Sequence, residues 1–132
     1  RPYACFVRED TRIPLIAMPD AIEALLALMD APAGSLTSPV YNASAFNPTA
    51  LELADLVRRS FPGERITFAS DRRRQAIVDS WPEDVDDSRA RRDWGFRPKY
   101  DLVRAFEEYL APNIRRRYAS SREACGGTGH VR

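Results

Sequence analysis

A lysine and a tyrosine stand side by side near residue 100, and together they are residue types that can take a proton from an alcohol. Lys99 is the only lysine of the sequence, and Tyr100 follows it directly. A tyrosine acts as such a base when a nearby lysine stabilises its phenolate. Side chains of consecutive residues, however, diverge on a helix and on a strand. We therefore interpret Lys99 and Tyr100 as surface positions of a loop.

Three other features look like parts of a site, and each has a plainer explanation. Residues 126–129 include three glycines, as phosphate-binding turns do, but no strand precedes them and too little chain follows to form a helix. His130, the only histidine, lies in the same stretch, and we assign it no role. The carboxylates within residues 83–87 form a solvated acidic turn, which suits helix capping better than paired acid and base catalysis.

Arginine supplies nearly all of the positive charge, in runs such as residues 72–74 and 115–117. Guanidinium groups can hold phosphate through paired hydrogen bonds. The chain nevertheless has 20 basic and 19 acidic residues and a formal net charge of +1, so no strong field attracts nucleic acid or an anionic membrane. We expect solvated arginines and no nucleic-acid partner.

The composition is that of a soluble globular chain of one domain, or of part of one. The 132 residues are 44% hydrophobic, and no apolar run approaches the roughly 18 residues that cross a bilayer. The first residues lack the apolar stretch of a signal peptide. Cys5 and Cys125 stand far apart and outside any metal-binding pattern, so we expect a reducing cytoplasm, no metal and no membrane association.

The elements that must position a site alternate between short strands and helices. Residues 3–7 suit a short strand, and the apolar run 13–18 has the pattern of a strand buried on both faces. Asp20, with Glu23 three residues on, predicts a capped helix of roughly ten residues. A further short strand is expected at 40–42.

The same alternation continues through the middle of the chain. Asn47, placed before a proline, predicts the N-cap of a second helix that ends near residue 60. Residues 65–68 alternate polar with apolar types, as a half-buried strand does. Residues 69–83 show no clean period, so we expect an ordered irregular segment there.

Two more helices are expected towards the C-terminus. Residues 86–88 cap a short helix that ends at Trp94, and Gly95 takes the left-handed position after it. The last helix begins at Asp101, and Pro112 disturbs it.

Three or four short strands among about four helices make an α/β lobe, and they are too few for a complete doubly wound sheet. We divide the chain into a folded lobe at residues 1–118 and a flexible tail at residues 119–132, which has little apolar content. The glycine-rich turn of a nucleotide-binding Rossmann fold is absent from the lobe. The sequence therefore predicts one lobe of a larger protein.

Several stretches between residues 3 and 110 resemble the short-chain L-threonine 3-dehydrogenases, which are extended short-chain dehydrogenases of the epimerase/dehydratase superfamily. The wider superfamily shares, in loose form, the passage from strand to helix before residue 22 and the end of the short helix at residues 86–96. The stretch at residues 74–82 is typical of a narrower group of proteins. The stretches are Asp10-Thr11-Arg12-Ile13-Pro14-Leu15 with Met18-Pro19-Asp20-Ala21-Ile22, Tyr41-Asn42-Ala43-Ser44-Ala45-Phe46 with Leu51-Glu52-Leu53-Ala54, residues 74–82, and residues 86–96 with Pro98.

This resemblance implies the C-terminal substrate-binding lobe of an extended Rossmann-type dehydrogenase, without the nucleotide-binding half. Family members bind NAD in that N-terminal half, which also carries a Tyr-x-x-x-Lys pair with a serine or threonine. They oxidise L-threonine to 2-amino-3-oxobutanoate, so this chain alone is expected to be inactive. The family also implies a homodimer at full length, and a lobe that exposes apolar surface when its Rossmann domain is missing.

Three residues of the narrower stretch are the candidate substrate-binding residues. Trp81 could exclude water above the nicotinamide, and a packing tryptophan explains it equally well. Arg74 or Gln75 could meet the substrate carboxylate or order this segment, although Arg74 also belongs to an exposed arginine run. No catalytic, cofactor-binding or metal-binding residue is expected in the chain.

Two alternatives stay open. The first is the lobe of a nucleotide-sugar epimerase or dehydratase, a class that places a diphosphate-binding arginine seven residues before the aspartate equivalent to Asp20. This chain has Ile13 there, and Arg12 is one residue away, which on a strand turns it to the other face and favours a smaller substrate. The second is a non-catalytic arginine-bearing interaction module, which the near-neutral charge disfavours.

Overall fold

The computed structural model describes residues 2–125, with side chains described up to residue 119. Within this part of the chain, strands β1 (Tyr3–Cys5) and β2 (Ile66–Phe68) pair in parallel, with Tyr3 opposite Ile66 and Cys5 opposite Phe68. The fold is therefore a mixed α/β fold with a small parallel sheet, as predicted. The helical elements in chain order are α1 (Met18–Asp30), the 3₁₀ turn η1 (Ala33–Ser35), α2 (Ala50–Ser60), α3 (Arg72–Val78), α4 (Ser88–Trp94), α5 (Leu102–Arg104), the π-helical η2 (Ala105–Leu110) and α6 (Ala111–Cys125).

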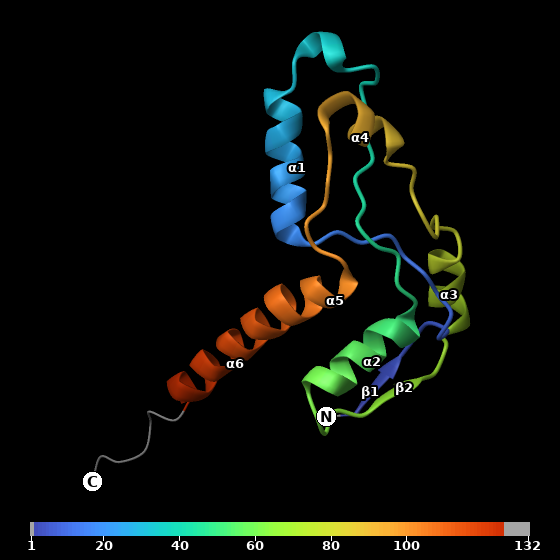
Figure 1. Cartoon of the computed structure of the whole chain (residues 1–132). Helices are drawn as coiled ribbons and strands as arrows, with labels where there is room; N and C mark the ends of the chain where they lie inside the picture. The colour runs from blue at the N-terminus through green and yellow to red at the C-terminus, as the bar shows by residue number, and fades with distance from the viewer. Residues whose placement is uncertain (1, 126–132) are drawn as a thin grey trace.

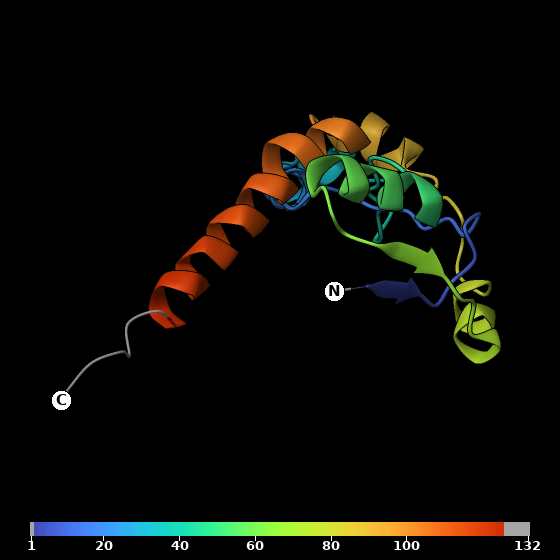
Figure 2. The same ribbon diagram turned by 90° about the horizontal axis from the view of Figure 1, so that it is seen from below.

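The elements form two neighbouring groups and one projecting helix (Figure 1). Helices α1 and α4 lie together at one end, while α2, α3 and the two strands lie at the other end. Seen from below, α2 covers the strands, and α3 stands at the far end of the sheet (Figure 2). The helix built from α5, η2 and α6 is continuous, and its α6 end points away from both groups.

Each group has its own small core. Ala24 of α1, Ala90 of α4 and Phe96 form the first core, and Tyr41 and Trp94 pack against it. In the second core, Leu56 of α2 packs with Phe106 and Ala111 of the long helix. Most of the buried apolar side chains in the described part are alanines, so the helices approach closely while many larger apolar side chains stay outside.

The strand predicted at residues 13–18 is wrong. This segment is extended but makes only an isolated bridge, in which the Leu15 amide donates to the carbonyl oxygen of Phe46 at 2.8 Å. Pro14 has no N–H to contribute to a ladder, and α1 already begins at Met18. The strand predicted at 40–42 is also wrong, because that segment forms no ladder in the described chain and its Tyr41 packs on the first core.

The predicted caps of the first two helices are also corrected. Helix α1 has Ala17 as its N-cap, and Asp20 lies inside the first turn, where its carboxylate accepts hydrogen bonds from a distant segment. Helix α2 begins after Thr49, whose hydroxyl accepts from the amide of Glu52 at 3.1 Å while the Glu52 carboxylate accepts from the Thr49 amide. This reciprocal capping box satisfies two free donors, which Asn47 as the cap would not do.

The segment predicted to be irregular, residues 69–83, contains helix α3. Its N-cap is Asp71, whose carboxylate accepts from the amides of Arg73 and Arg74 at 3.0 and 2.9 Å. The helix has seven residues and shows no apolar period, because its exposed face is arginine-rich. The N-cap residue therefore signals this helix in the sequence, whereas the spacing of apolar residues does not.

Two C-terminal predictions, the end of α4 and the start of α5, are confirmed. Gly95 closes α4 with a φ of 74°, and Asp101 caps α5 by accepting from the Arg104 amide, both as predicted. The π-helical η2 ends at Leu110, two residues before Pro112. The proline ring crowds the carbonyl group four residues earlier, and proline has no N–H to donate. Helix α6 continues to Cys125, past the tail start predicted at residue 119, because alanine and arginine favour helix. Residues 126–132, with the glycine stretch and His130, lie outside the described residues.

Candidate functional site

An apolar cavity of about 370 Å³ lies between the small sheet, α2 and the end of α3. Tyr3 and Cys5 face it from β1, and Ile66 and Phe68 face it from β2, because alternate residues of paired strands share one face. Among the described residues, the lining holds no charged side chain. The cavity can therefore hold an apolar group.

Trp81 stands at the wall that the α3 segment contributes. Its side chain lines the cavity and remains 54% exposed, so it is not a buried packing tryptophan. The Trp81 amide donates to the carbonyl oxygen of Val78 at 2.9 Å, which ties the residue to the last turn of α3. Trp94, by contrast, packs between Tyr41 and Phe96, with ring centroids 6.0 and 5.6 Å away.

Gln75 is buried, with 4% of its surface exposed, and its amide group is engaged within the chain. Its Oε1 accepts from the backbone amide of Arg8 at 2.7 Å. Its Nε2 donates to Thr11 Oγ1 at 3.0 Å and to Asp79 Oδ1 at 2.6 Å. Of the two roles expected for Gln75, this geometry fits the ordering of the segment and leaves no free amide atom for a substrate carboxylate.

Arg8 and Asp79 complete the same cluster, although 71 residues separate them. The Arg8 guanidinium donates two hydrogen bonds to the Asp79 carboxylate, at 2.9 and 3.0 Å. These bonds, and then the bond from Gln75, hold the pKa of Asp79 below its usual value. We call Arg8, Thr11, Gln75 and Asp79 the clamp.

Sequence reasoning missed Arg8 and Asp79 as parts of this cluster. The available signal was the spacing of Gln75 and Asp79, which lie four residues apart and therefore on one face of a helix. That signal required the helix α3, which the sequence pattern did not predict.

Arg74 lies against the ring of Phe6, with its guanidinium carbon 5.0 Å from the ring centroid. Phe6 also lines the cavity, so Arg74 sits beside it. Its guanidinium forms no ion pair with another described side chain. The structure thus gathers the three predicted residues around one cavity: Trp81 in the wall, Arg74 over a lining ring and Gln75 in the clamp.

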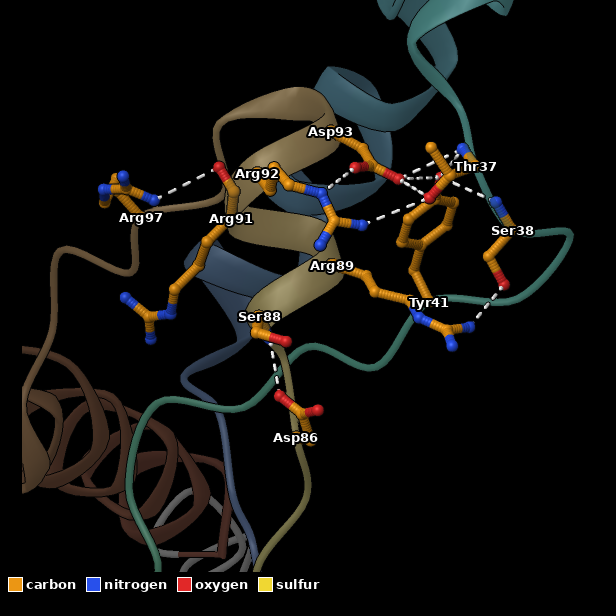
Figure 3. Close-up of polar contacts among 10 residues, drawn as sticks. All are labelled: Thr37, Ser38, Tyr41, Asp86, Ser88, Arg89, Arg91, Arg92, Asp93 and Arg97. Atoms are coloured by element: carbon orange, nitrogen blue, oxygen red, sulfur yellow. Dashed lines mark hydrogen bonds and ion pairs between the residues drawn. The ribbon is translucent and has the colours of Figure 1, made fainter.

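A second polar cluster fastens the loop after η1 to helix α4 and lies apart from the cavity (Figure 3). The Asp93 carboxylate accepts from the Tyr41 hydroxyl at 2.8 Å and from the Thr37 amide at 3.1 Å, and it forms an ion pair with Arg92. Its side chain is 2% exposed. The hydrogen bond from the Thr37 hydroxyl is the main cause that holds the pKa of Asp93 far below its usual value. This is a structural carboxylate.

Arg12 does not reach the cavity. Its Nη1 donates to the carbonyl oxygen of Asn47 at 2.8 Å and lies 3.7 Å from the Glu52 carboxylate. Ile13, in contrast, is part of the cavity lining. The position where nucleotide-sugar enzymes place a diphosphate-binding arginine is therefore apolar here.

The described residues do not fit a dinucleotide or a metal ion. The turn from β2 into α3 runs over residues 69–71 and contains no glycine, so a pyrophosphate has no open backbone to approach. No group of three or more His, Cys, Asp or Glu side chains in the described part could hold a metal ion. Similarly, none of its helices is long and apolar enough to cross a membrane.

Comparisons with known proteins agree with the fold. No protein-family model matches the chain. It is 44% identical over 100 residues to the mitochondrial L-threonine 3-dehydrogenase of Bos taurus, and 39% identical over 102 residues to an uncharacterized epimerase/dehydratase of Staphylococcus haemolyticus. Among solved structures, the L-threonine dehydrogenase of Cupriavidus necator superimposes with a TM-score of 0.77 at 40% identity, over 86% of this chain and 41% of that one.

The chain belongs to this family of L-threonine dehydrogenases and epimerase/dehydratases. The two curated relatives are matched over 76% of this chain but over only 27% and 32% of their own length. The L-threonine dehydrogenase of Phytophthora infestans, with a TM-score of 0.78 at 31% identity, is covered over 37%. The chain thus corresponds to a part of the family's dehydrogenases.

Proposed function

We propose that the chain is the C-terminal substrate-binding lobe of an NAD-dependent L-threonine 3-dehydrogenase. A Rossmann domain outside this sequence supplies the NAD site and the catalytic tyrosine and lysine, and the complete enzyme oxidises L-threonine to 2-amino-3-oxobutanoate. The observation that carries the proposal is the likeness to named L-threonine dehydrogenases over most of the chain, in sequence and in structure alike. The lobe alone is inactive.

The exposed face of α1 supports a missing domain. The side chain that α1 buries in the first core is an alanine, Ala24, while its large apolar side chains point outward. Such a continuous apolar stripe costs free energy in water and marks a contact surface. The stripe residues and their exposed fractions are Met18 58%, Ile22 52%, Leu25 58%, Leu26 52% and Met29 71%.

Within the complete enzyme we assign Trp81 to the substrate side of the cavity, where its ring keeps water from the reacting carbon. We assign Arg74 to the substrate carboxylate, because its guanidinium has no carboxylate partner among the described residues and can offer two parallel N–H groups. The chemistry of hydride transfer belongs to the cofactor, and no step of it runs through a residue of this chain.

The test is NADH formation from L-threonine and NAD in three samples: the chain alone, the chain mixed with a separately produced Rossmann half of the Cupriavidus necator enzyme, and a graft in which the chain replaces the matching part of that enzyme. We expect activity in the graft or the mixture and none in the chain alone. In the active graft, Arg74→Gln should lower kcat/KM about tenfold or more, at least ~1.4 kcal/mol. Arg73→Gln, on the exposed side of the same helix, is the matched control.

A graft that folds and binds NAD but leaves L-threonine unoxidised contradicts the proposal. Activity of the chain alone contradicts the assignment of the catalytic groups to another domain. The staphylococcal relative favours one further candidate, the lobe of an epimerase or dehydratase. Tight binding of a UDP-sugar by the graft would establish that candidate. Two observations argue against it: Ile13 is apolar, and the Arg12 guanidinium already bonds to the Asn47 carbonyl oxygen.

The ion pairs of the arginines argue against a nucleic-acid-binding module. Arg58, Arg91 and Arg104 each pair with a carboxylate on their own helix or at its cap, as Arg8 and Arg92 do elsewhere. A homodimer and a cytoplasmic location stay part of the proposal for the complete enzyme. The name of the bovine relative assigns that protein to mitochondria, so the compartment calls for direct localisation of the full-length protein.

A further inference from the structure

We propose that Gln75 is a positioning residue that sets the width of the apolar cavity by holding its two walls together. The inference concerns the geometry of the cavity, and it rests on the proposed function only for its effect on catalysis. Gln75 itself does not line the cavity.

The two walls meet at the clamp. Val78 and Trp81 line one wall, and both follow Gln75 closely on the α3 segment. The adjoining wall includes Val7 and Thr11. Gln75 bonds directly to Thr11 and to the amide of Arg8, the residue that follows Val7. The side chain of one residue therefore joins two segments that both line the cavity.

The backbone passes this constraint on to Trp81. The Asp79 amide donates to the Gln75 carbonyl oxygen at 2.8 Å, and the Trp81 amide donates to the Val78 carbonyl oxygen at 2.9 Å. The Ser80 hydroxyl caps the same turn by donating to the Ile77 carbonyl oxygen at 2.6 Å. With α3 fixed by the clamp, the ring of Trp81 has a defined place at the cavity mouth.

Only an amide satisfies this position. Its oxygen faces a donor, the Arg8 amide, while its nitrogen faces two oxygens, those of Thr11 and Asp79. A methionine of similar length would leave the Arg8 amide without its acceptor. A glutamate would place a second carboxyl group in the position that lies 2.6 Å from Asp79. Two carboxylates this close repel each other, so ionisation of both is unfavourable.

The charged groups around Gln75 are Arg8 and Asp79 of the clamp, together with Asp10, which pairs with Arg8. The Arg8 guanidinium is shared between Asp79 and Asp10, at 2.9 and 3.1 Å. A carboxyl group introduced by Gln75→Glu would therefore contact the Asp79 carboxylate directly. The Arg8 guanidinium lies on the other side of that carboxylate. Its proton affinity would rise because of Asp79, and in the protonated form it could again donate to Asp79 as the amide does.

The experiment uses the full 132-residue chain with Trp94→Phe, so that Trp81 is the remaining tryptophan. Quenching of Trp81 fluorescence by acrylamide reports how well the cavity mouth is held. We expect Gln75→Met to raise the quenching constant towards that of free tryptophan and to shift the emission to the red. Gln75→Glu should do the same at neutral pH and return to the parent value in acid, where the new carboxyl group is protonated. Arg73→Gln should change nothing.

Recovery in acid tests the hydrogen bonds of Gln75, because a protonated carboxyl group can accept from the Arg8 amide and donate to Asp79 as the glutamine does, whereas methionine can do neither at any pH. A folded Gln75→Met chain with unchanged quenching, or a Gln75→Glu chain whose quenching does not respond to pH, overturns the inference. Asp79→Asn gives a second route if Gln75→Met unfolds, and it should raise quenching because the ion pair that joins Arg8 to the α3 segment is lost.

None of these measurements involves NAD or threonine. A graft that forms no NADH while the pH recovery holds would remove the proposed function and leave the role of Gln75 standing. In an active graft, Gln75→Met should raise the KM for L-threonine more than it lowers kcat, since it loosens the cavity without touching the reacting atoms.

Discussion

Asp20 and Lys99 lie 79 residues apart in the sequence, and a carboxylate oxygen of Asp20 lies 3.1 Å from the amide nitrogen of Lys99. Its other oxygen accepts from the amide of Tyr100 at 3.0 Å. Because Asp20 is 3% exposed, this fork joins the first turn of α1 to the segment between α4 and α5 away from water. A carboxylate that accepts two backbone N–H groups is a stronger connection than either bond alone.

Asp20→Ala should lower the free energy of unfolding by about 2–4 kcal/mol, because two backbone donors lose their acceptor in a buried place. Urea denaturation followed by circular dichroism measures the change. Glu23→Gln is the matched control on the same helix, since Glu23 pairs with the Lys99 ammonium group in an exposed position. The control should cost less than about 1 kcal/mol, and equal losses in the two variants would contradict the role of the fork.

Asp93 should make the chain sensitive to acid. Its folded pKa lies below that of the unfolded chain, so its contribution is complete above the unfolded value of about 3.9 and is lost as the pH falls towards the folded pKa. Asp93→Asn should therefore lower the Tm at neutral pH and flatten the fall of the Tm in acid. Thermal unfolding between neutral and acid pH measures both effects, with Asp30→Asn at the exposed end of α1 as control. Parallel curves for parent and Asp93→Asn would refute this.

Gly95→Ala should destabilise the chain by about 1–2 kcal/mol, because a β-carbon is strained in the left-handed region. The φ of Gly95 is 74°, and no atom lies within 4 Å of where its β-carbon would be, so the cost comes from the backbone and not from a clash. Gly34 also has open space around it and lacks the positive φ. Gly34→Ala should be neutral or slightly stabilising, and a loss as large as that of Gly95→Ala would contradict the explanation.

Features set by neighbouring residues could be predicted from the sequence. The cap at Asp101, the left-handed Gly95 and the strand at residues 65–68 depend on a few adjacent side chains, and the structure has all three. The mixed α/β character followed from the same local signals. The resemblance to a family then gave the segment order that periodicity alone does not give.

Features set by distant residues could not be predicted in this way. Asp20 followed by Glu23 has the spacing of a capping box, but the buried amides of Lys99 and Tyr100 bind its carboxylate more effectively than α1 does. The apolar run 13–18 looked like a central strand, yet no neighbouring strand exists in the described chain to pair with it. Tertiary contacts decided both cases.

The candidate site shows the same division. Trp81, Arg74 and Gln75 were predicted as site residues from the sequence, and they lie around one cavity. The clamp partner Arg8 was out of reach, because nothing near it in the sequence indicates that Asp79, 71 residues later, will hold its guanidinium. Only the three-dimensional fold shows that Gln75 bonds to Thr11 and to the Arg8 amide.

The long separation between Asp20 and Lys99 determines how long Asp20 waits for its partner while the chain is synthesised on the ribosome. At about 5–20 residues per second, the 79 residues that separate them take roughly 4–16 s to make. Throughout that interval α1 has emerged with its apolar stripe bare and its buried carboxylate still without the amides that hold it. The nascent chain therefore passes through a period in which chaperones can recognise it, and the buried carboxylate finds its amides only when the segment before α5 has been made.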